Sequence, residues 1–237
     1  MLEGDMTITF LCLANSRKEG GKCVAGIRLH DFSWFRPVSD NEHGELDPSH
    51  YILDDGNEAS ILDIIRMDFI DHQPEPHQPE NWLIDDNYQW ELIERIDKEK
   101  AHVLLDNLLT TDVFLFGNQN DCVPYSEIED YELDRSLCLI EPSDIFWEIT
   151  KSRHGRRQTR AKFTFNDFDY NLVVTDPEWE SILRSLDFGE YSHDNLLFGK
   201  AKHPGSEDRI LLTVSLGEPF NKKCYKLVAG VICLPQT

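Results

Sequence analysis

The sequence predicts a mainly β protein with a few helices (α+β), arranged as two small β-barrels in tandem. Short apolar runs rich in β-branched and aromatic residues recur along the 237-residue chain, a pattern typical of strands. A hairpin-like pattern near the amino end returns near the carboxyl end, and an acidic stretch lies between them. A chain of this length can bury one large core or two smaller ones without metal or disulfides.

Two stretches of the chain resemble each other. Phe10–Leu29 reads FLCLANSRKEGGKCVAGIRL, and Leu211–Leu234 reads LLTVSLGEPFNKKCYKLVAGVICL. In each, an apolar run is followed by a polar break with glycine, then Lys-Cys, Val-Ala-Gly and a second apolar run. We interpret each stretch as two strands joined by a charged connection, and the pair as a tandem duplication. Chance similarity is the alternative, because Val-Ala-Gly is common.

Residues 1–125 are expected to form the first barrel, with an acidic insertion and helices. The apolar patterns predict strands at 7–13, 22–29, 33–38, 60–70 and 113–116, and one or two helices within 89–109. Residues 14–21 are expected to connect the first two strands. Residues 40–100 contain 18 acidic side chains and four basic ones.

Residues 126–237 are expected to form the second barrel. Strands are predicted at 137–140, 145–151, 161–165, 170–174, 210–216 and 226–234. Asp176 and Pro177 have the residue types of an N-cap and a first helical position, so a helix is expected from there to about Leu186. Many short strands with one interrupting helix favour a small closed barrel such as an OB-fold, and a β-sandwich is the alternative.

Composition restricts the class of protein. The start lacks the basic and long apolar regions of a signal peptide, and no run approaches the length of a membrane span. We therefore expect a cytoplasmic protein with no membrane partner and with reduced cysteines. The formal net charge of −21 disfavours non-specific attraction to nucleic acid or anionic lipid, although binding depends on the local field.

Lys151–Lys162 (KSRHGRRQTRAK) is the strongest functional signal. Six of these twelve residues are basic, whereas the whole chain has 23 Lys and Arg. The stretch lies between two expected strands, so we expect an exposed loop whose guanidinium groups reach phosphates. The alternative is a solvated loop whose charges pair with the protein's own carboxylates. The candidate binding residues are Lys151, Arg153, His154, Arg156, Arg157, Arg160 and Lys162. The aromatic neighbours expected to stack on bases are Phe146, Trp147, Phe163 and Phe165.

A second candidate loop is Asn15–Lys22 (NSRKEGGK), whose glycines can expose backbone N–H groups to a phosphate. It lacks the spacing of a P-loop, and a plain charged hairpin is the alternative. The candidate residues here and on the next strand are Arg17, Lys18, Lys22, Trp34 and Arg36.

Catalytic and metal signals are weak. The chain contains no G-x-S-x-G, H-E-x-x-H or C-x-x-C motif. His72, His77, Glu75 and Glu80 carry metal-ligating groups, but the prolines among them leave the geometry unfixed. We predict no catalytic residue, no metal and no cofactor, and we favour a protein that is not an enzyme.

Several stretches together resemble the dual OB-containing domain family. They are LCLANSRKEGGKCVAGIRL with WFRPVS, HQPENW, RAKFTFNDFDYNLVVTDPEWE and LLTVSLGEPFNKKCYKLVAGVICL, which span nearly the whole chain. The resemblance implies two OB-like barrels and nucleic-acid binding, in a prokaryotic defence or genome-maintenance setting. It supplies no catalytic residue.

The favoured function is therefore binding of single-stranded DNA or RNA by two OB-like barrels, with the two basic loops meeting on one face. Two alternatives remain open. The acidic first half can dock a basic protein partner, or the protein can sense a small anionic nucleotide bound between the barrels.

Overall fold

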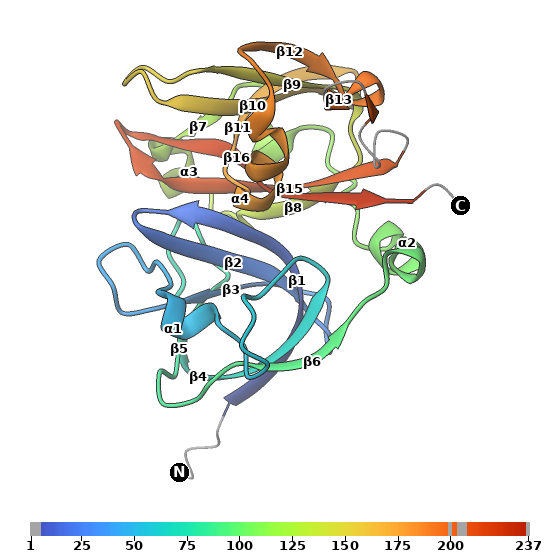
Figure 1. Ribbon diagram of the computed structural model, residues 1–237. Coiled ribbons are helices and arrows are strands. Elements are labelled where there is room, and N and C mark those ends of the chain that lie inside the picture. The colour runs from blue at the N-terminus through green and yellow to red at the C-terminus, as the bar shows by residue number, and fades with distance from the viewer. Residues whose placement is uncertain (1–5, 199–200, 203–207, 236–237) are drawn as a thin grey trace.

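Strands make up most of the molecule and form two curled sheets stacked one on the other (Figure 1). The computed structural model describes residues 6–198, 201–202 and 208–235. The strands of the first sheet are β1 (Met6–Lys18), β2 (Gly21–Arg28), β3 (Trp34–Val38), β4 (Asp63–His72), β5 (Asn81–Ile84) and β6 (Glu91–Arg95).

The first sheet closes into a five-stranded barrel. Strand β1 pairs with β2 on one side and with β4 on the other, while β3 pairs in parallel with β5, which pairs with β4. This order is that of an OB-fold, the five-stranded Greek-key barrel. Strand β6 extends the sheet beside β4.

Strand β1 serves two cores, which explains its long apolar run. Its residues alternate in direction, so Phe10 and Cys12 fill the first barrel. Leu11 and Leu13 point the other way and pack with residues of the second barrel. All four side chains are fully buried, as expected for a strand covered on both faces.

The second sheet repeats the strand order of the first. Its strands are β7 (Cys122–Pro124), β8 (Leu137–Ile140), β9 (Ser143–Lys151), β10 (Arg157–Phe165), β11 (Phe168–Val174), β12 (Gly189–Ser192), β15 (Arg209–Phe220) and β16 (Lys223–Leu234). Strand β8 pairs with β15, and β9 pairs with β10. Only Glu141 and Pro142 separate β8 from β9, so the two act as halves of one interrupted first strand. The parallel pair β11–β16 then corresponds to β3–β5, and the chain contains two OB-like barrels.

The two sequence-similar hairpins face each other where the barrels meet. Ala25 of β2 and Ala229 of β16, from the two Val-Ala-Gly segments, lie in one cluster of buried residues, and Thr213 Oγ1 of β15 donates to the Leu13 carbonyl at 2.6 Å. The hairpins are not equivalent within their barrels, because β1–β2 are the first and second strands while β15–β16 are the fourth and fifth. What the two hairpins share is their position at the inter-barrel contact.

The helices are short and lie outside the sheets. They are α1 (Pro48–Tyr51), α2 (Lys98–Asp106), α3 (Tyr125–Asp130) and α4 (Pro177–Ile182), with 3-10 turns η1 (Leu115–Gly117), η2 (Leu183–Ser185) and η3 (His193–Asn195) and a small pair of strands β13 (Leu197–Phe198) and β14 (Ala201–Lys202). Asp176 caps α4 as expected, accepting hydrogen bonds from the amides of Glu178 and Trp179. No helix among these is long and apolar enough to cross a bilayer.

Three local expectations were wrong. Ala14–Lys18 is not a connection but continues β1, pairing with β2 up to the Glu19-Gly20 turn. Glu91–Arg95 is a strand rather than helix, because the free edge of β4 offers it hydrogen bonds. The segment Val113–Phe116 is not a strand. It leads into the η1 turn, where Phe116 and Gly117 both have positive φ (48° and 81°).

Candidate nucleic-acid interface

The basic stretch forms the tip of the β9–β10 hairpin, at the upper left of Figure 1. Lys151 and Arg157 are the last paired residues. The turn between them is held by hydrogen bonds from Ser152 N to the Arg156 carbonyl (2.7 Å) and from Gly155 N to the Ser152 carbonyl (2.9 Å), with Gly155 at φ +76°. The observed turn is therefore shorter than the loop that the sequence predicted, because residues 157–162 belong to β10.

The turn presents two arginines and a histidine to solvent without partners in the described chain. Arg153, His154 and Arg156 are all exposed. None of their side chains makes a hydrogen bond or ion pair with the part of the chain that the structure describes. In a protein with a formal charge of −21, these guanidinium groups are not neutralised by direct contact with a carboxylate, so they remain available to an anionic ligand.

Phe188 adds an aromatic surface beside the turn. Its ring is 56% exposed, with Lys151 Nζ 5.3 Å and Arg157 Cζ 5.7 Å from the ring centroid. Arg157 also donates to the carbonyls of Leu183 (3.0 Å) and Leu186 (2.8 Å), which ties the segment after α4 to the hairpin. An exposed ring flanked by cations is suited to base stacking.

The aromatic residues expected from the sequence are mostly in the core. Trp147, Phe163 and Phe165 are buried, and Phe146 is 36% exposed. Inward and outward positions alternate along β9 and β10, and these three rings fall on the inward face. Phe188 was missed because it lies outside the basic stretch. The signal for it was an aromatic residue directly before Gly189 in an otherwise polar segment.

The inner part of the basic stretch is occupied by intramolecular contacts. Arg160 donates from Nε to Asn171 Oδ1 and from Nη2 to the Asn171 carbonyl, both at 2.6 Å. Lys162 Nζ lies 3.1 Å from Glu148 and 2.5 Å from Glu190, and these hydrogen bonds raise the pKa of Lys162. The alternative of pairing with the protein's own carboxylates thus applies to Lys162 but not to the tip.

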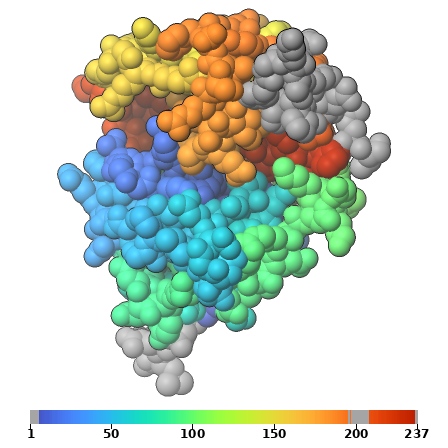
Figure 2. Space-filling model, in the orientation of Figure 1, coloured from blue at the N-terminus to red at the C-terminus, as the bar shows by residue number. Residues whose placement is uncertain are grey.

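The cations of the first hairpin form ion pairs instead of a second binding loop. Arg17 makes a bidentate pair with Glu180 (2.7 and 2.8 Å), and Lys18 pairs with Glu218 at 2.8 Å. Both pairs link the first barrel to the second. Figure 2 shows the segment around α4 (orange) reaching the first barrel (blue and cyan). Lys22 pairs with Glu58 within the first barrel.

Arg36 and Trp34 lie at the inter-barrel contact. Arg36 is 2% exposed, and its Nη2 contacts Glu80 at 3.0 Å, Ser136 at 2.8 Å and Ser215 at 3.3 Å. Trp34 is half-buried against residues of both barrels. The structure therefore does not place these two residues with the β9–β10 tip.

The β15–β16 turn is a further exposed element that the sequence reasoning overlooked. Asn221 and Lys222 form it with positive φ values of 50° and 62°. Phe220 is 64% exposed, and Lys222 and Lys223 are exposed without an ion pair to the described part of the chain. Both tips project to the left of the second barrel in Figure 1. In the order of the barrel they are the connections of strands one to two and four to five, the loops that flank the ligand face of OB-folds.

Metal-ligating groups do not gather. His72 Nε2 lies 2.8 Å from the Pro79 carbonyl, whereas His77 is buried against Tyr125. Among the described residues no cluster of three or more His, Cys, Asp or Glu side chains has a geometry that could hold a metal ion.

Two barrels with this strand order, joined through their hairpins, define a protein of tandem OB-folds. The chain belongs to the dual OB-containing domain family, whose model matches residues 8–231. No curated protein matches the sequence.

Two of the similar solved structures are complexes with DNA. The Ifi202 HINa domain in complex with 20-bp double-stranded DNA is 11% identical, with 98% of this chain and 97% of that chain covered and a TM-score of 0.33. A murine DNA-binding protein bound to double-stranded DNA is 8% identical, with 98% and 100% covered and a TM-score of 0.31. TM-scores this low carry no inference about function.

Proposed function

We propose that this protein binds single-stranded nucleic acid, DNA or RNA, at the hairpin tips of its second barrel. The observation that carries the proposal is the exposed ring of Phe188 beside Lys151 and Arg157, next to the unpaired Arg153 and Arg156. An unpaired base can stack on the ring while the guanidinium groups contact the flanking phosphates. A duplex hides its base faces, so the ring favours single strands.

The acidic remainder of the molecule restricts where a strand can lie. Interactions between exposed charges are largely screened beyond about 8 Å at physiological ionic strength. A strand held at the tips therefore feels mainly the local cations, whereas one laid along the acidic first barrel is repelled. We expect a short contact and a binding constant that falls steeply with salt.

The test is fluorescence anisotropy with labelled oligo(dT), oligo(U) and a duplex of equal length, at low and at physiological salt. The variant Arg153→Ala/Arg156→Ala should abolish most binding and lower the slope of log K against log salt by about two. The matched control is Arg66→Ala/Arg95→Ala. It removes two similarly exposed arginines from the first barrel and should bind like the wild type.

Substitution of Phe188 measures the contribution of stacking separately from that of charge. Phe188→Ala should weaken single-strand binding about tenfold without changing the salt slope, because base stacking contributes about 1–3 kcal/mol. Tyr88→Ala is the control, since Tyr88 is 51% exposed and lies between β5 and β6 of the first barrel. Wild-type binding by the double arginine variant would overturn the proposal, as would equal losses in the test and control variants.

A second candidate function is supported by a cavity near the contact of the two barrels. It has a volume of about 340 Å³, and its lining includes Arg28, Arg135, Trp34 and Trp82. Indole rings and guanidinium groups suit a base and a phosphate, so this cavity fits a sensor of a small nucleotide. A nucleotide panel in a thermal-shift assay tests it. A rise in Tm that Trp82→Ala removes supports the sensor, and a flat response excludes it.

A further inference from the structure

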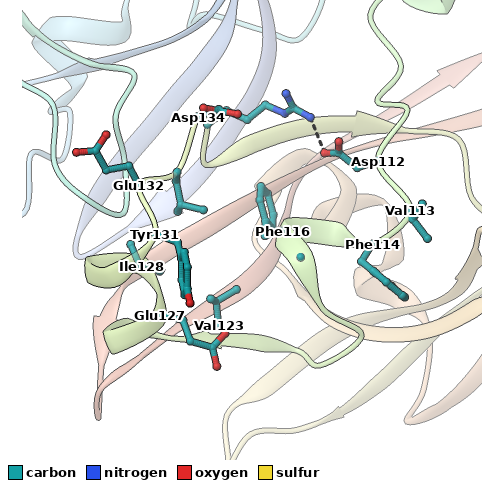
Figure 3. Close-up of a pocket in the computed structure, with 13 residues that line it drawn as sticks. Asp112, Val113, Phe114, Phe116, Val123, Glu127, Ile128, Tyr131, Glu132 and Asp134 are labelled. Carbon is teal, nitrogen blue, oxygen red and sulfur yellow. Dashed lines mark hydrogen bonds and ion pairs between the residues drawn. The ribbon is translucent and has the colours of Figure 1, made fainter.

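A cavity of about 530 Å³ lies in the segment that leads from the first barrel into the second (Figure 3). Residues up to and including the η1 turn form one wall, and α3 with the residues after it forms the other. None of its lining residues belongs to the hairpin tips. Its lining residues are Asp112, Val113, Phe114, Phe116, Gly117, Val123, Glu127, Ile128, Tyr131, Glu132, Leu133, Asp134 and Arg135.

The floor of the cavity is apolar and partly exposed. Phe116 lies between Tyr131 on one side and Phe114 on the other (Figure 3), and it packs on the cluster formed by Val123 and Ile128. Tyr131 is 77% exposed, which is unusual for a large aromatic side chain. Phe114 lies against Phe168, with ring centroids 4.7 Å apart, so the exposed aromatic surface of the cavity is mainly the ring of Tyr131.

The rim is acidic and largely unpaired. Among the four carboxylates, only Asp112 forms an ion pair, with Arg135 at 2.5 Å. The side chains of Glu127, Glu132 and Asp134 have no hydrogen bond or ion pair with the described residues. Because Arg135 is the single basic residue of the lining, the local charge is strongly negative and repels phosphates.

Aromatic rings together with free carboxylates specify the chemistry of the occupant. A guanidinium group stacks flat on a tyrosine or phenylalanine ring and at the same time forms charge-assisted hydrogen bonds with a carboxylate. We propose that this cavity docks an arginine-bearing basic peptide segment of a protein partner. The volume lies within the range of about 300–1,000 Å³ typical of ligand sites. The three free carboxylates are spread along the α3 wall, from Glu127 to Asp134, which fits several cationic side chains better than one small ion.

This proposal does not depend on nucleic-acid binding. It also moves the acidic docking surface from where the sequence predicted it. Three of the 18 carboxylates at 40–100, those of Glu58, Glu91 and Asp55, pair with the cations Lys22, Arg66 and Arg95. What sets the cavity apart is that its three free carboxylates lie beside the exposed ring of Tyr131.

The experiment measures binding of a fluorescein-labelled peptide of alternating arginine and leucine to the full chain by anisotropy. An analogue with glutamine in place of every arginine tests the need for charge. The test variant is Glu127→Gln/Glu132→Gln. The matched control is Glu129→Gln/Asp130→Asn. It removes two charges between Glu127 and Glu132, at positions that do not line the cavity.

The proposal expects the arginine peptide to bind and the glutamine analogue not to bind. The test variant should weaken binding about tenfold, equivalent to about 1.4 kcal/mol, while the control variant stays within about twofold of the wild type.

Tyr131 tests the aromatic contact. Tyr131→Ala should bind the arginine peptide more weakly than the wild type, whereas Tyr131→Phe should bind it like the wild type, because the phenylalanine ring still stacks. Equal losses in test and control variants would mean non-specific attraction to an acidic protein and would overturn the proposal, as would equal binding of the two peptides. Thermal unfolding of each variant confirms that it is folded.

Discussion

The guanidinium of Arg36 lies 3.0 Å from the carboxylate of Glu80, and both side chains are almost fully buried where the two barrels meet. Both residues come from the first barrel. The second barrel completes the cluster with Ser136, whose amide donates to Glu80 at 3.1 Å, and with the Ser215 hydroxyl, which lies 3.3 Å from Arg36. The pair therefore fixes how one barrel sits on the other, and it joins the WFRPVS and HQPENW segments that carry the family resemblance.

The first prediction concerns this pair. Glu80→Gln leaves the Arg36 charge buried without a counter-ion, which should lower the free energy of unfolding by about 3–5 kcal/mol. The double variant Glu80→Gln/Arg36→Met removes that charge and should recover much of the loss. Urea unfolding measures both.

The exposed pair Arg66–Glu91 is the control, since Glu91→Gln should cost less than about 1 kcal/mol. Equal effects of Glu80→Gln and Glu91→Gln would contradict the structural role of the buried pair.

The second prediction concerns the contact of the hairpins at Gly230. A Cβ there would lie 2.4 Å from the Leu13 carbonyl oxygen of the other barrel. Gly230→Ala must push two strands apart, so it should destabilise the fold by about 2 kcal/mol or more. For Gly217→Ala the first contact is the end of the Leu227 side chain at 3.2 Å, and this side chain can move aside. The unfolding midpoint in urea should therefore be lower for Gly230→Ala than for Gly217→Ala, and the reverse order would contradict the packing.

The third prediction concerns Asp176, which accepts hydrogen bonds from the amides of Glu178, Trp179 and Val231. Burial raises the pKa of Asp176 from 3.8 to about 6. Between these values the folded state holds a proton that the unfolded chain has released. The contribution of Asp176 to stability therefore falls as pH rises through this range, by about 3 kcal/mol in total.

Asp176→Asn stays neutral, so the difference in unfolding free energy between wild type and this variant should fall from pH 4 to pH 6. Urea unfolding at several pH values measures it. A difference that rises with pH would show that the three amide donors outweigh burial.

The fourth prediction concerns the thiols. Of the six free cysteines five are buried and Cys233 is half-buried. Burial raises the pKa of Cys233 and Cys138 to about 12 and that of Cys224 to about 11. Because the thiolate is the reactive form, the folded protein should react slowly with Ellman's reagent at pH 8. After unfolding in urea all six should react. Rapid reaction of several thiols in the folded state would contradict this burial.

Much of the fold could be predicted from local sequence. Strand β8 has the predicted bounds, and the helix α4 begins where Asp176 and Pro177 indicated. Backbone preferences and side-chain alternation act within a few residues, so a single chain displays them. The helix predicted at Glu91–Arg95 was wrong, because this segment becomes a strand by pairing with the edge of β4, which lies about 25 residues away in sequence.

The candidate site also has features that the sequence predicts and features that only the tertiary structure sets. The position and charge of the β9–β10 tip follow from its sequence, since a basic run between two strands must form a turn. Which cations stay free does not follow. Arg17 is paired with Glu180, 163 positions away, while Arg153 meets no partner in the described chain. Phe188 lies beside the tip in a segment that Arg157 binds through the carbonyls after α4.

The sequence by itself thus determined the longer strands and the location of the basic run, because these depend on neighbouring residues. It did not determine short strands such as β5 and β6. Only the tertiary structure decided which charges neutralise each other and which aromatic rings reach the surface. The physical reason is that ion pairs and burial depend on distances between residues far apart in the chain, and those distances exist only once the two barrels have closed and packed together.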